Sequence, residues 1–462
     1  MPDQDHFQLR VESESFAADQ LFVASFEGTE RISRLFEYRV LVVSPKHDGP
    51  KAEEMLGARV SLVIERDGVN GGWSGARRLS GVVAEVVDRL AGHADIRVYE
   101  LRVVPRAHAL ALVETQDIFL GASVPDIVKS KLAAVNLAAA SRWSLAGTYA
   151  PREFVVQYHE SDLAFASRLT EHLGISFYFS QGDDGESIVF TDHIAGFLPI
   201  DDAKGAPYRP RGEGLDVFAL EAKHAMVPGY YAVRDYNYRT PLVDITGEAS
   251  IEDAFPGGVI EFGSHHKTPQ EGAALASVRA EERRAGQLVY AGESHVPLTA
   301  GARFTVEDHP DLGTLALLVT EVDHAGGGVV AGVGAPAVVG YRNRFRAIPA
   351  DRTFRPARVT PRPRIAGLVT GLIDPGGAPP DAKYAQIDAM GRYTVRFLFD
   401  TTPPGERAAS RPVRMIQNHV GENYGTHFPL KPGIEVVIAF VDGDPDRPLI
   451  VGAVPNPTKP SP

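Results

Sequence analysis

The sequence contains no cysteine, and this absence excludes several classes of site at once. Without thiols there can be no disulfide framework, no thiolate ligand for zinc or an iron–sulfur cluster, and no cysteine nucleophile. The sequence also lacks an uninterrupted apolar run of membrane-spanning length. Residues 1–10 are polar and acidic, without the basic start and apolar core of a secretory signal. We therefore expect a soluble protein made in the cytosol.

Basic residues are in short supply as well. Forty-seven Lys and Arg stand against 59 Asp and Glu, which gives a net charge of −12. A molecule of this sign repels phosphate backbones, so we predict no nucleic-acid partner. The composition, with 44% hydrophobic and 23% charged residues, is otherwise that of a globular protein, and 462 residues are enough for about three folding units.

The motifs of common enzymes are also missing. There is no pair of His one helical turn apart with a Glu between them, and no Gly-Lys-Ser or Gly-Lys-Thr phosphate loop. Gly332-Val-Gly334 lacks the third glycine of a dinucleotide loop. The string closest to a serine-hydrolase elbow, residues 72–76, ends in Ala76 and is interpreted as a hairpin turn. We predict no catalytic, cofactor-binding or metal-ligating residue, no cofactor, and a protein that is not an enzyme.

Alternating carboxylates at Asp442, Asp444 and Asp446 resemble the start of a calcium loop. The rest of that loop is missing, because Arg447 and Ala453 stand where it needs Gly and Glu. Asp-Gly and Asp-Pro pairs are typical of tight turns. We therefore predict a turn between strands at 436–441 and 448–451.

The first part of the chain alternates apolar and polar residues in short runs separated by turn residues. This period of two predicts strands at residues 7–11, 40–43, 60–64, 81–87 and 96–104. Such spacing is typical of an antiparallel sheet or barrel and not of alternating β and α units. Residues 1–110 are predicted to form an all-β domain.

The pattern changes near residue 117, and residues 111–205 are predicted to form an α+β insert. Apolar spacing near 3.6 predicts one helix at 124–137. A second helix is expected at 162–173, with Ser161 and Asp162 able to cap its start and Gly174 placed to end it in the left-handed conformation. Strands are predicted before and after that second helix, at 152–158 and 175–179.

Residues 206–347 are predicted to form a second β domain with one helix. The sequence indicates a strand with aromatic alternation at 230–238, a helix at 269–285, and further strands at 304–306, 314–322 and 335–345.

The region from 348 to 383 is rich in proline, which disfavours both helices and central strands, and is predicted to be a linker. Short strands are then expected at 393–399, 413–417, 434–441 and 448–451. Their number and length fit a small OB-fold barrel at 384–455, followed by a tail at 456–462. The predicted fold class is mainly β with an α+β insert, consisting of two β domains and this small barrel.

Several strings spread along the chain form a specific combination of motifs. The longest covers residues 152–169, and the others lie at 234–238, 341–349, 391–397 and 425–448. The residues that carry these motifs are Gln157, Tyr158, Asp162, Phe165, Arg168, Leu169, Gly174, Arg234, Asp235, Tyr236, Asn343, Arg344, Phe345, Gly391, Arg392, Gly425, Pro429, Gly433, Glu435, Gly443, Asp444, Pro445, Arg447 and Pro448. Together they resemble the VgrG-type spike proteins of type VI secretion systems, which are related to the hub and spike of contractile phage tails.

This resemblance implies a homotrimer in which each chain gives two tube-type β-barrel domains, so that three chains form a pseudo-sixfold ring on an Hcp-like hexameric tube. It further implies a PAAR-type tip protein or separate needle, an effector or its adaptor, and baseplate proteins as partners. Members of the family usually continue into a β-helix needle, which we expect to be absent from this polypeptide. The protein is then expected to be cytoplasmic before firing, to leave through the apparatus without a signal peptide, and to contact a membrane only on puncture.

Three alternatives stay open at this point. The chain could be the hub of a phage-tail-like or extracellular contractile injection particle. Less favoured is a spike-borne cell-wall hydrolase, because residues 401–410 leave too little room for an inserted catalytic domain. Least favoured is an OB domain that binds an oligonucleotide or a glycan, because residues 384–451 show few basic residues interleaved with aromatic ones.

Overall fold

The structure is a computed structural model that describes residues 7–45, 49–66, 75–90, 95–182, 185–200, 205–212, 214–330, 333, 336–379, 382–403 and 408–461. Residues 72–74 and Gly332, on which two of the interpretations above depend, lie outside the described residues. The chain forms two compact units, each assembled from separated segments. Unit 1 contains residues 1–108, 136–147 and 171–357, and unit 2 contains residues 109–135, 148–170 and 358–462.

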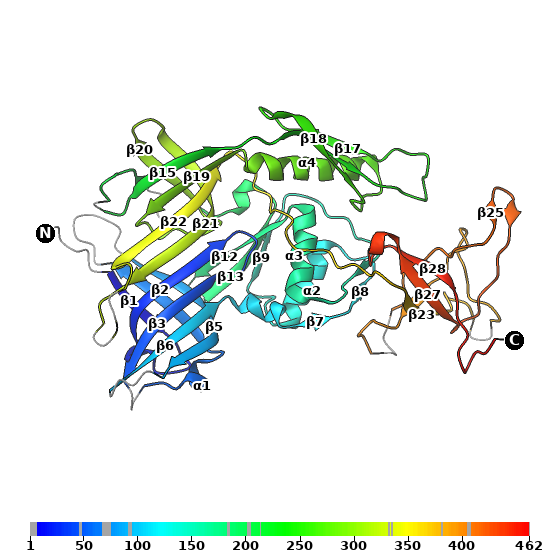
Figure 1. Ribbon diagram of the computed structural model, residues 1–462, viewed down its shortest axis with the longest axis horizontal. Coiled ribbons are helices and arrows are strands. Elements are labelled where there is room, and N and C mark those ends of the chain that lie inside the picture. Colours follow the sequence, from blue (N-terminus) through cyan, green and yellow to red (C-terminus); the bar gives the residue numbers. More distant parts are fainter. Residues whose placement is uncertain are drawn as a thin grey trace. The chain divides into compact units, whose positions relative to one another are not determined.

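Unit 1 is built on one large sheet (Figure 1). Its main strands are β1 (Phe7–Glu12), β2 (Phe22–Arg31), β3 (Glu37–Pro45), β4 (Arg59–Arg66), β5 (Gly75–Arg89), β6 (Ile96–Val104), β15 (Val217–His224), β19 (Leu288–Ser294), β21 (Gly313–Gly327) and β22 (Gly340–Pro349). They are ordered β1-β4-β5-β6-β3-β2-β21-β22-β19-β15, and β20 (Arg303–His309) and β14 (Ala206–Pro207) complete the twelve strands. Neighbours in the main path pair antiparallel.

Period-two patterning explains why these segments form strands with two different faces. In β22, Tyr341, Asn343 and Phe345 are buried while Arg342 and Arg344 are exposed. Because successive side chains of a strand point to opposite faces, the aromatic residues enter the core and the arginines face water. All five strands predicted before residue 106 are confirmed, as are those at 304–306 and 314–322.

β2 and β21 join the two predicted β domains inside this sheet. Their antiparallel register runs from Ser25 opposite Gly327 to Arg31 opposite Glu321. Strands of the first and second predicted β domains therefore share one ladder of backbone hydrogen bonds. The prediction of a mainly β protein is confirmed, and the residue limits of the predicted domains stay predictions.

Smaller elements complete unit 1. They are β9 (Ser141–Ser144), β12 (Ser176–Gly182), β13 (Gly185–Thr191), β16 (Pro228–Arg234), β17 (Gly247–Ser250), β18 (Phe255–Phe262), α1 (Ala52–Met55), α4 (Pro269–Ala285) and 3-10 turns at Ala18–Gln20 and Ile194–Gly196. Helix α4 has the predicted limits: Thr268 accepts the Glu271 backbone N–H, Pro269 opens the first turn, and Arg283 lies in the last turn. It packs on the sheet of β17, β16 and β18 (Figure 1) through Tyr231 and Leu275.

Unit 2 combines short elements from the middle of the chain with the C-terminal segment. It contains β7 (Glu114–Thr115), β8 (Ile118–Phe119), α2 (Val124–Ala134), β10 (Val155–Val156), β11 (Glu160–Ser161), β23 (Val369–Ile373), β24 (Val395–Phe397), β25 (Val420–Gly421), β26 (Tyr424–Gly425), β27 (Glu435–Phe440) and β28 (Pro448–Ala453). Helix α3 (Asp162–Leu173) begins in unit 2 and ends in unit 1, and 3-10 turns lie at Arg106–Ala111 and Val441–Gly443. The C-terminal strands form an antiparallel sheet ordered β24-β23-β27-β28. An OB-fold barrel in this segment stays a prediction.

The core of unit 2 mixes residues from both of its sources. Phe154 and Val156, from the segment before α3, are buried in one cluster with Val395, Phe397 and Ile438 of the C-terminal sheet. Burying this apolar surface together couples the middle of the chain to its end. Among the described residues, none of the helices is long and apolar enough to cross a membrane.

Several predicted elements differ from the structure: the helix expected at 124–137 ends at Ala134, and the strands expected at 230–238 and 393–399 are shorter than predicted. The strand predicted at 152–158 shrinks to β10, because its backbone groups bond to loops and a side chain instead of a ladder. The strand predicted at 413–417 is reduced to isolated bridges, since Pro412 at its start cannot donate to a ladder. Conversely, β23 forms inside the predicted linker, in the proline-free window between Pro363 and Pro375.

Candidate functional site

The first candidate is a buried polar junction at the start of α3, in unit 2. Ser161 accepts the Ala164 backbone N–H over 3.2 Å and so caps the helix, as predicted. Arg168 lies further along α3. It forms two parallel hydrogen bonds to Glu160 over 2.7 and 2.8 Å and also donates to the carbonyl of Val156. Burial raises the pKa of Glu160, and the Arg168 guanidinium acts against that rise. This bidentate geometry fixes the helix against the preceding segment.

Asp162 lies at the centre of the same junction. It accepts hydrogen bonds from Gln157 over 2.8 Å and lies 2.9 Å from the ammonium of Lys131, a buried residue of α2. Lys131 also binds Asp117 over 2.5 Å. Burial would raise the pKa of Asp117, but Lys131 and neighbouring hydroxyl groups hold it below its ordinary value. The buried ion pair of Lys131 with Asp162 thus connects α2 to the start of α3.

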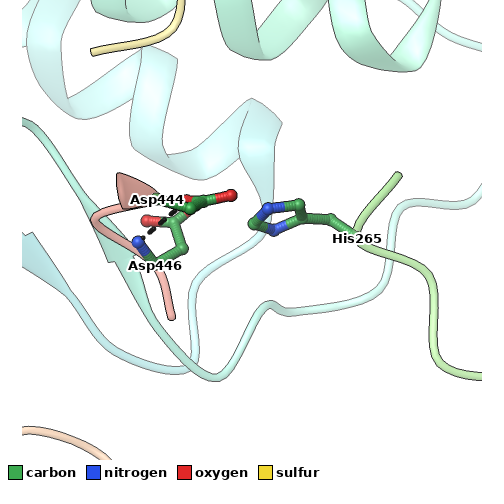
Figure 2. Close-up of side chains that lie close together, drawn as sticks. All are labelled: His265, Asp444 and Asp446. Carbon is green, nitrogen blue, oxygen red and sulfur yellow. Dashed lines mark hydrogen bonds between the residues drawn. The ribbon is translucent and has the colours of Figure 1, made fainter. Parts of the chain in front are cut away.

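The predicted turn at residues 442–446 is confirmed and connects this junction to the C-terminal sheet. Asp446 Oδ1 accepts the backbone N–H of Val156 over 2.7 Å. Asp444 accepts the Asp446 backbone N–H over 3.1 Å, as Figure 2 shows, and the guanidinium of Arg362 over 2.9 Å. Both carboxylates are therefore engaged by protein donors. Two sequence motifs far apart in the chain, residues 152–169 and 425–448, meet at this turn.

A second buried cluster, in unit 1, was not singled out by sequence reasoning. Glu30 of β2 accepts hydrogen bonds from the Tyr38 hydroxyl, the Thr299 hydroxyl and the Ala300 backbone N–H. His324 Nε2 of β21 lies 3.3 Å from its carboxylate, and Arg77 of β5 lies 3.9 Å away. Burial alone would raise the pKa of Glu30, but His324, Arg77 and the hydroxyl donors lower it to about 2.

The aromatic partners of this cluster are protonated. Burial and the neighbouring Glu30 carboxylate raise the pKa of Tyr38, and burial raises that of Tyr341. The Tyr341 hydroxyl accepts from Asn343, which also donates to the Val296 carbonyl over 2.6 Å. One signal in the sequence points to this cluster: Glu30 occupies an inward position in the alternation of β2, where Phe26 and Gly28 are also buried.

The remaining motif residues are distributed over both units. Gly174 ends α3 with a φ of +70° and the Asp235 side chain ends β16 by accepting the backbone N–H of Tyr236. Leu169, Phe165 and Phe345 are core residues, Arg392 pairs with Asp388, and Glu435 accepts from Asn456. Tyr158 lies in the segment before α3, where its backbone forms a hydrogen bond with Glu160, and Gly443, Pro445 and Arg447 lie in or beside the turn with Asp444 and Asp446. The structure places Arg234, Arg344, Gly391, Gly425, Pro429, Gly433 and Pro448 in strands, turns and surfaces apart from the two clusters.

A cleft of about 440 Å³ in unit 2 is lined mainly by apolar side chains and backbone, including Ile365, Leu368 and Phe440, and its one acidic residue is Asp442. Its one cationic side chain, Arg364, donates to the Asp442 carbonyl. The described lining therefore offers no pairing of a nucleophile with a base. The two buried clusters hold segments that are distant in the sequence in fixed positions by charge-assisted hydrogen bonds.

Comparison with known proteins identifies the family of this chain. Residues 29–329 match the family described as phage tail baseplate hub (GPD). The chain belongs to this baseplate hub family. Glu30, His324 and Asp162 lie within the matched residues, whereas Tyr341 and the turn with Asp444 and Asp446 lie beyond them.

Curated relatives of this hub protein match it over nearly its whole length. The spike protein VgrG5 of Pseudomonas aeruginosa is 29% identical over 98% of the chain, and VgrG3 of Vibrio cholerae is 28% identical over 99%. The chain spans about half the length of these relatives, 58% and 45% respectively. A further relative from Vibrio cholerae, of which it spans 41%, is named an actin cross-linking toxin.

A solved structure shares the hub fold from end to end. The Escherichia coli protein c3393, described as a component of the type VI secretion system with structural similarity to the T4 tail proteins gp27 and gp5, superposes with a TM-score of 0.68. It is 25% identical, and the match covers 97% of this chain and 100% of the other. A chain of the solved PdpA–VgrG complex has the same fold at 8% identity, with a TM-score of 0.62 over 98% of this chain and 88% of the other. The hub protein is thus homologous to VgrG spike proteins and to phage baseplate hubs.

Proposed function

We propose that the chain is the hub and spike-bearing component of a type VI secretion apparatus. The single observation that carries this proposal is the end-to-end match in fold with c3393, a component of that system. The matches to VgrG proteins, which extend over almost all of this chain, support the same assignment. The function is mechanical, so it requires rigid packing and fixed geometry rather than turnover.

In this proposal three copies form a closed ring that seats on a hexameric Hcp-like tube. Closed rotational symmetry distributes an axial force equally over the three chains. The ring carries a PAAR-type tip or separate needle and an effector or its adaptor, and it contacts baseplate proteins. The occurrence of this fold in a chain of the PdpA–VgrG complex supports complex formation by it.

The buried charged groups fit a rigid part and not a catalyst. Arg168 and Glu160, like Glu30 and its donors, satisfy each other in the protein interior. Fully paired buried networks fix one arrangement of the chain. We accordingly propose that the chain itself catalyses no reaction, is cytoplasmic before firing, and leaves through the apparatus, meeting a membrane only on puncture.

Deletion of the gene in the source bacterium tests this function. The apparatus should then fail to release the Hcp tube protein into the culture medium, and the wild-type gene supplied in trans should restore release. Unchanged Hcp release after deletion would contradict the proposal. Because the family is that of phage baseplate hubs, a second candidate is the hub of a free contractile particle. That candidate predicts that the chain sediments with cell-free particles.

A further inference from the structure

An arm in unit 2, residues 418–429, projects from the C-terminal sheet, and every residue in it is exposed. It contains the hairpin of β25 and β26, which pairs with no other strand among the described residues (Figure 1). Val420, Tyr424 and Phe428 in this arm expose 72, 60 and 67% of their surface. An isolated two-stranded hairpin is marginally stable in water, and clustered exposed apolar side chains indicate a docking surface.

The arm is nevertheless held in a defined shape. At its base, the buried Tyr393 hydroxyl accepts the backbone N–H of Leu430 and lies 3.0 Å from His427 Nε2, to which it can donate its proton. At its tip, the ring of Tyr424 lies over Gly421, where an added Cβ would come within 2.1 Å of the ring. A preorganised segment loses little conformational entropy when it docks.

The charge of the arm indicates what docks there. Glu422 is the one residue with a formal charge in residues 418–429, in a chain whose net charge is −12. Two copies of such a chain repel each other wherever acidic surfaces meet, and a nearly uncharged apolar surface is where this repulsion is smallest. The arm also contains no Lys or Arg, so it has no cation with which to hold phosphate groups of a lipid surface or nucleic acid.

We propose that this arm docks against a second copy of the same chain and contributes contacts that hold the assembly together. The inference rests on the trimeric assembly in the proposed function and names the segment that mediates it. Val420 and Phe428 supply apolar contact area. Tyr424 supplies a rigid aromatic anchor of the kind that dominates interface energetics.

Site-specific crosslinking tests the contact without removing it. Because this sequence contains no cysteine, a benzophenone maleimide can be attached at one position through Thr426→Cys, at an exposed residue of the arm that leaves Val420, Tyr424 and Phe428 in place. The matched control is Leu242→Cys, at a residue of unit 1 that is 98% exposed. Irradiation of the full chain should give species of two and three chain masses, multiples of 49.9 kDa, for the label at position 426 and one chain mass for the control.

Substitution tests whether the contact contributes to assembly. The double variant Val420→Ser with Phe428→Ser leaves the Tyr424 ring on Gly421 in place, so the hairpin should keep its shape. By light scattering, it should need a concentration at least about tenfold higher than the wild type for half-assembly, with an unchanged circular dichroism spectrum. Leu242→Ser, the control, should assemble as the wild type does.

The outcomes separate this inference from the function on which it rests. A wild-type assembly that persists while the label at position 426 crosslinks only within one chain would overturn the arm contact and leave the spike function standing. Crosslinks in cells only to a different protein would overturn the choice of a second copy. A wild-type chain that stays at one chain mass at all concentrations would overturn the arm contact, and Hcp release would then decide the function separately.

Discussion

The backbone N–H of Val156 donates to the Asp446 carboxylate over 2.7 Å, across 290 positions of the sequence. Val156 lies in the motif before α3, and Asp446 lies in the turn between β27 and β28. The bond is buried and one partner is charged, so it is stronger than an ordinary backbone hydrogen bond. It therefore fixes the register between the middle of the chain and the C-terminal sheet of unit 2.

Asp446→Ala should destabilise the fold by about 1–3 kcal/mol, because it leaves the buried Val156 N–H without its acceptor. Asp446→Asn keeps a carbonyl acceptor and should cost less. Urea unfolding at one fixed protein concentration, followed by circular dichroism, measures both. The exposed control Asp311→Ala should stay within about 0.5 kcal/mol of the wild type. Equal effects of Asp446→Ala and the control would show that the bond contributes nothing.

Arg168→Lys should cost about 2 kcal/mol, since a lysine cannot make the two parallel bonds to Glu160 and also reach the Val156 carbonyl. Arg344 offers a matched surface position, because its side chain is 69% exposed beside Glu293. There the change from Arg to Lys should alter stability by less than about 0.5 kcal/mol. Thermal unfolding of both variants provides the comparison, and a neutral Arg168→Lys would contradict the role given to the buried pair.

Gly174→Ala should destabilise the protein by about 2–4 kcal/mol. The residue has a φ of +70°, and an added Cβ would lie 2.5 Å from Val278 and 2.9 Å from Arg355. Gly286 follows α4 with a φ of −81°, and its added Cβ would meet only an ordinary contact at 3.5 Å. Gly286→Ala is therefore the control and should change the unfolding midpoint little. Similar midpoints for the two variants would argue against strain at Gly174.

The stability conferred by Glu30 should depend on pH. Its folded pKa, about 2, lies below the ordinary value of 4.5, so its contribution is present above about pH 4.5 and is lost as the pH falls towards 2. At neutral pH, Glu30→Gln should cost on the order of 3 kcal/mol. The difference from the wild type should shrink as the pH is lowered from 5 to 2. Urea unfolding across this range measures it, with the exposed Glu85→Gln as control.

A difference between Glu30→Gln and the wild type that stays constant down to pH 2 would show that the carboxylate does not titrate in this range. A variant that is fully stable at neutral pH would show that its hydrogen bonds to Thr299 and Ala300 are dispensable.

The sequence by itself determined the elements whose signals are local. Helix α4 has the predicted limits because Thr268, Pro269 and the basic last turn act within the helix itself. The cap of α3 at Ser161 and its left-handed end at Gly174 were predicted for the same reason. Period-two alternation likewise located the strands of the large sheet, since that pattern follows from the pleat of a single strand.

Tertiary structure decided everything that depends on partners distant in the sequence. A strand is predicted at residues 152–158, but the backbone N–H of Val156 bonds to Asp446 and that of Gln157 bonds to the Asp117 carbonyl. Glu30 became a strongly acidic buried group because β21 and the loop at Thr299 bring donors to it. Local sequence patterns do not specify which distant segments come into contact. Burial makes these contacts energetically important, because a polar group removed from water must find its hydrogen-bond partner within the protein.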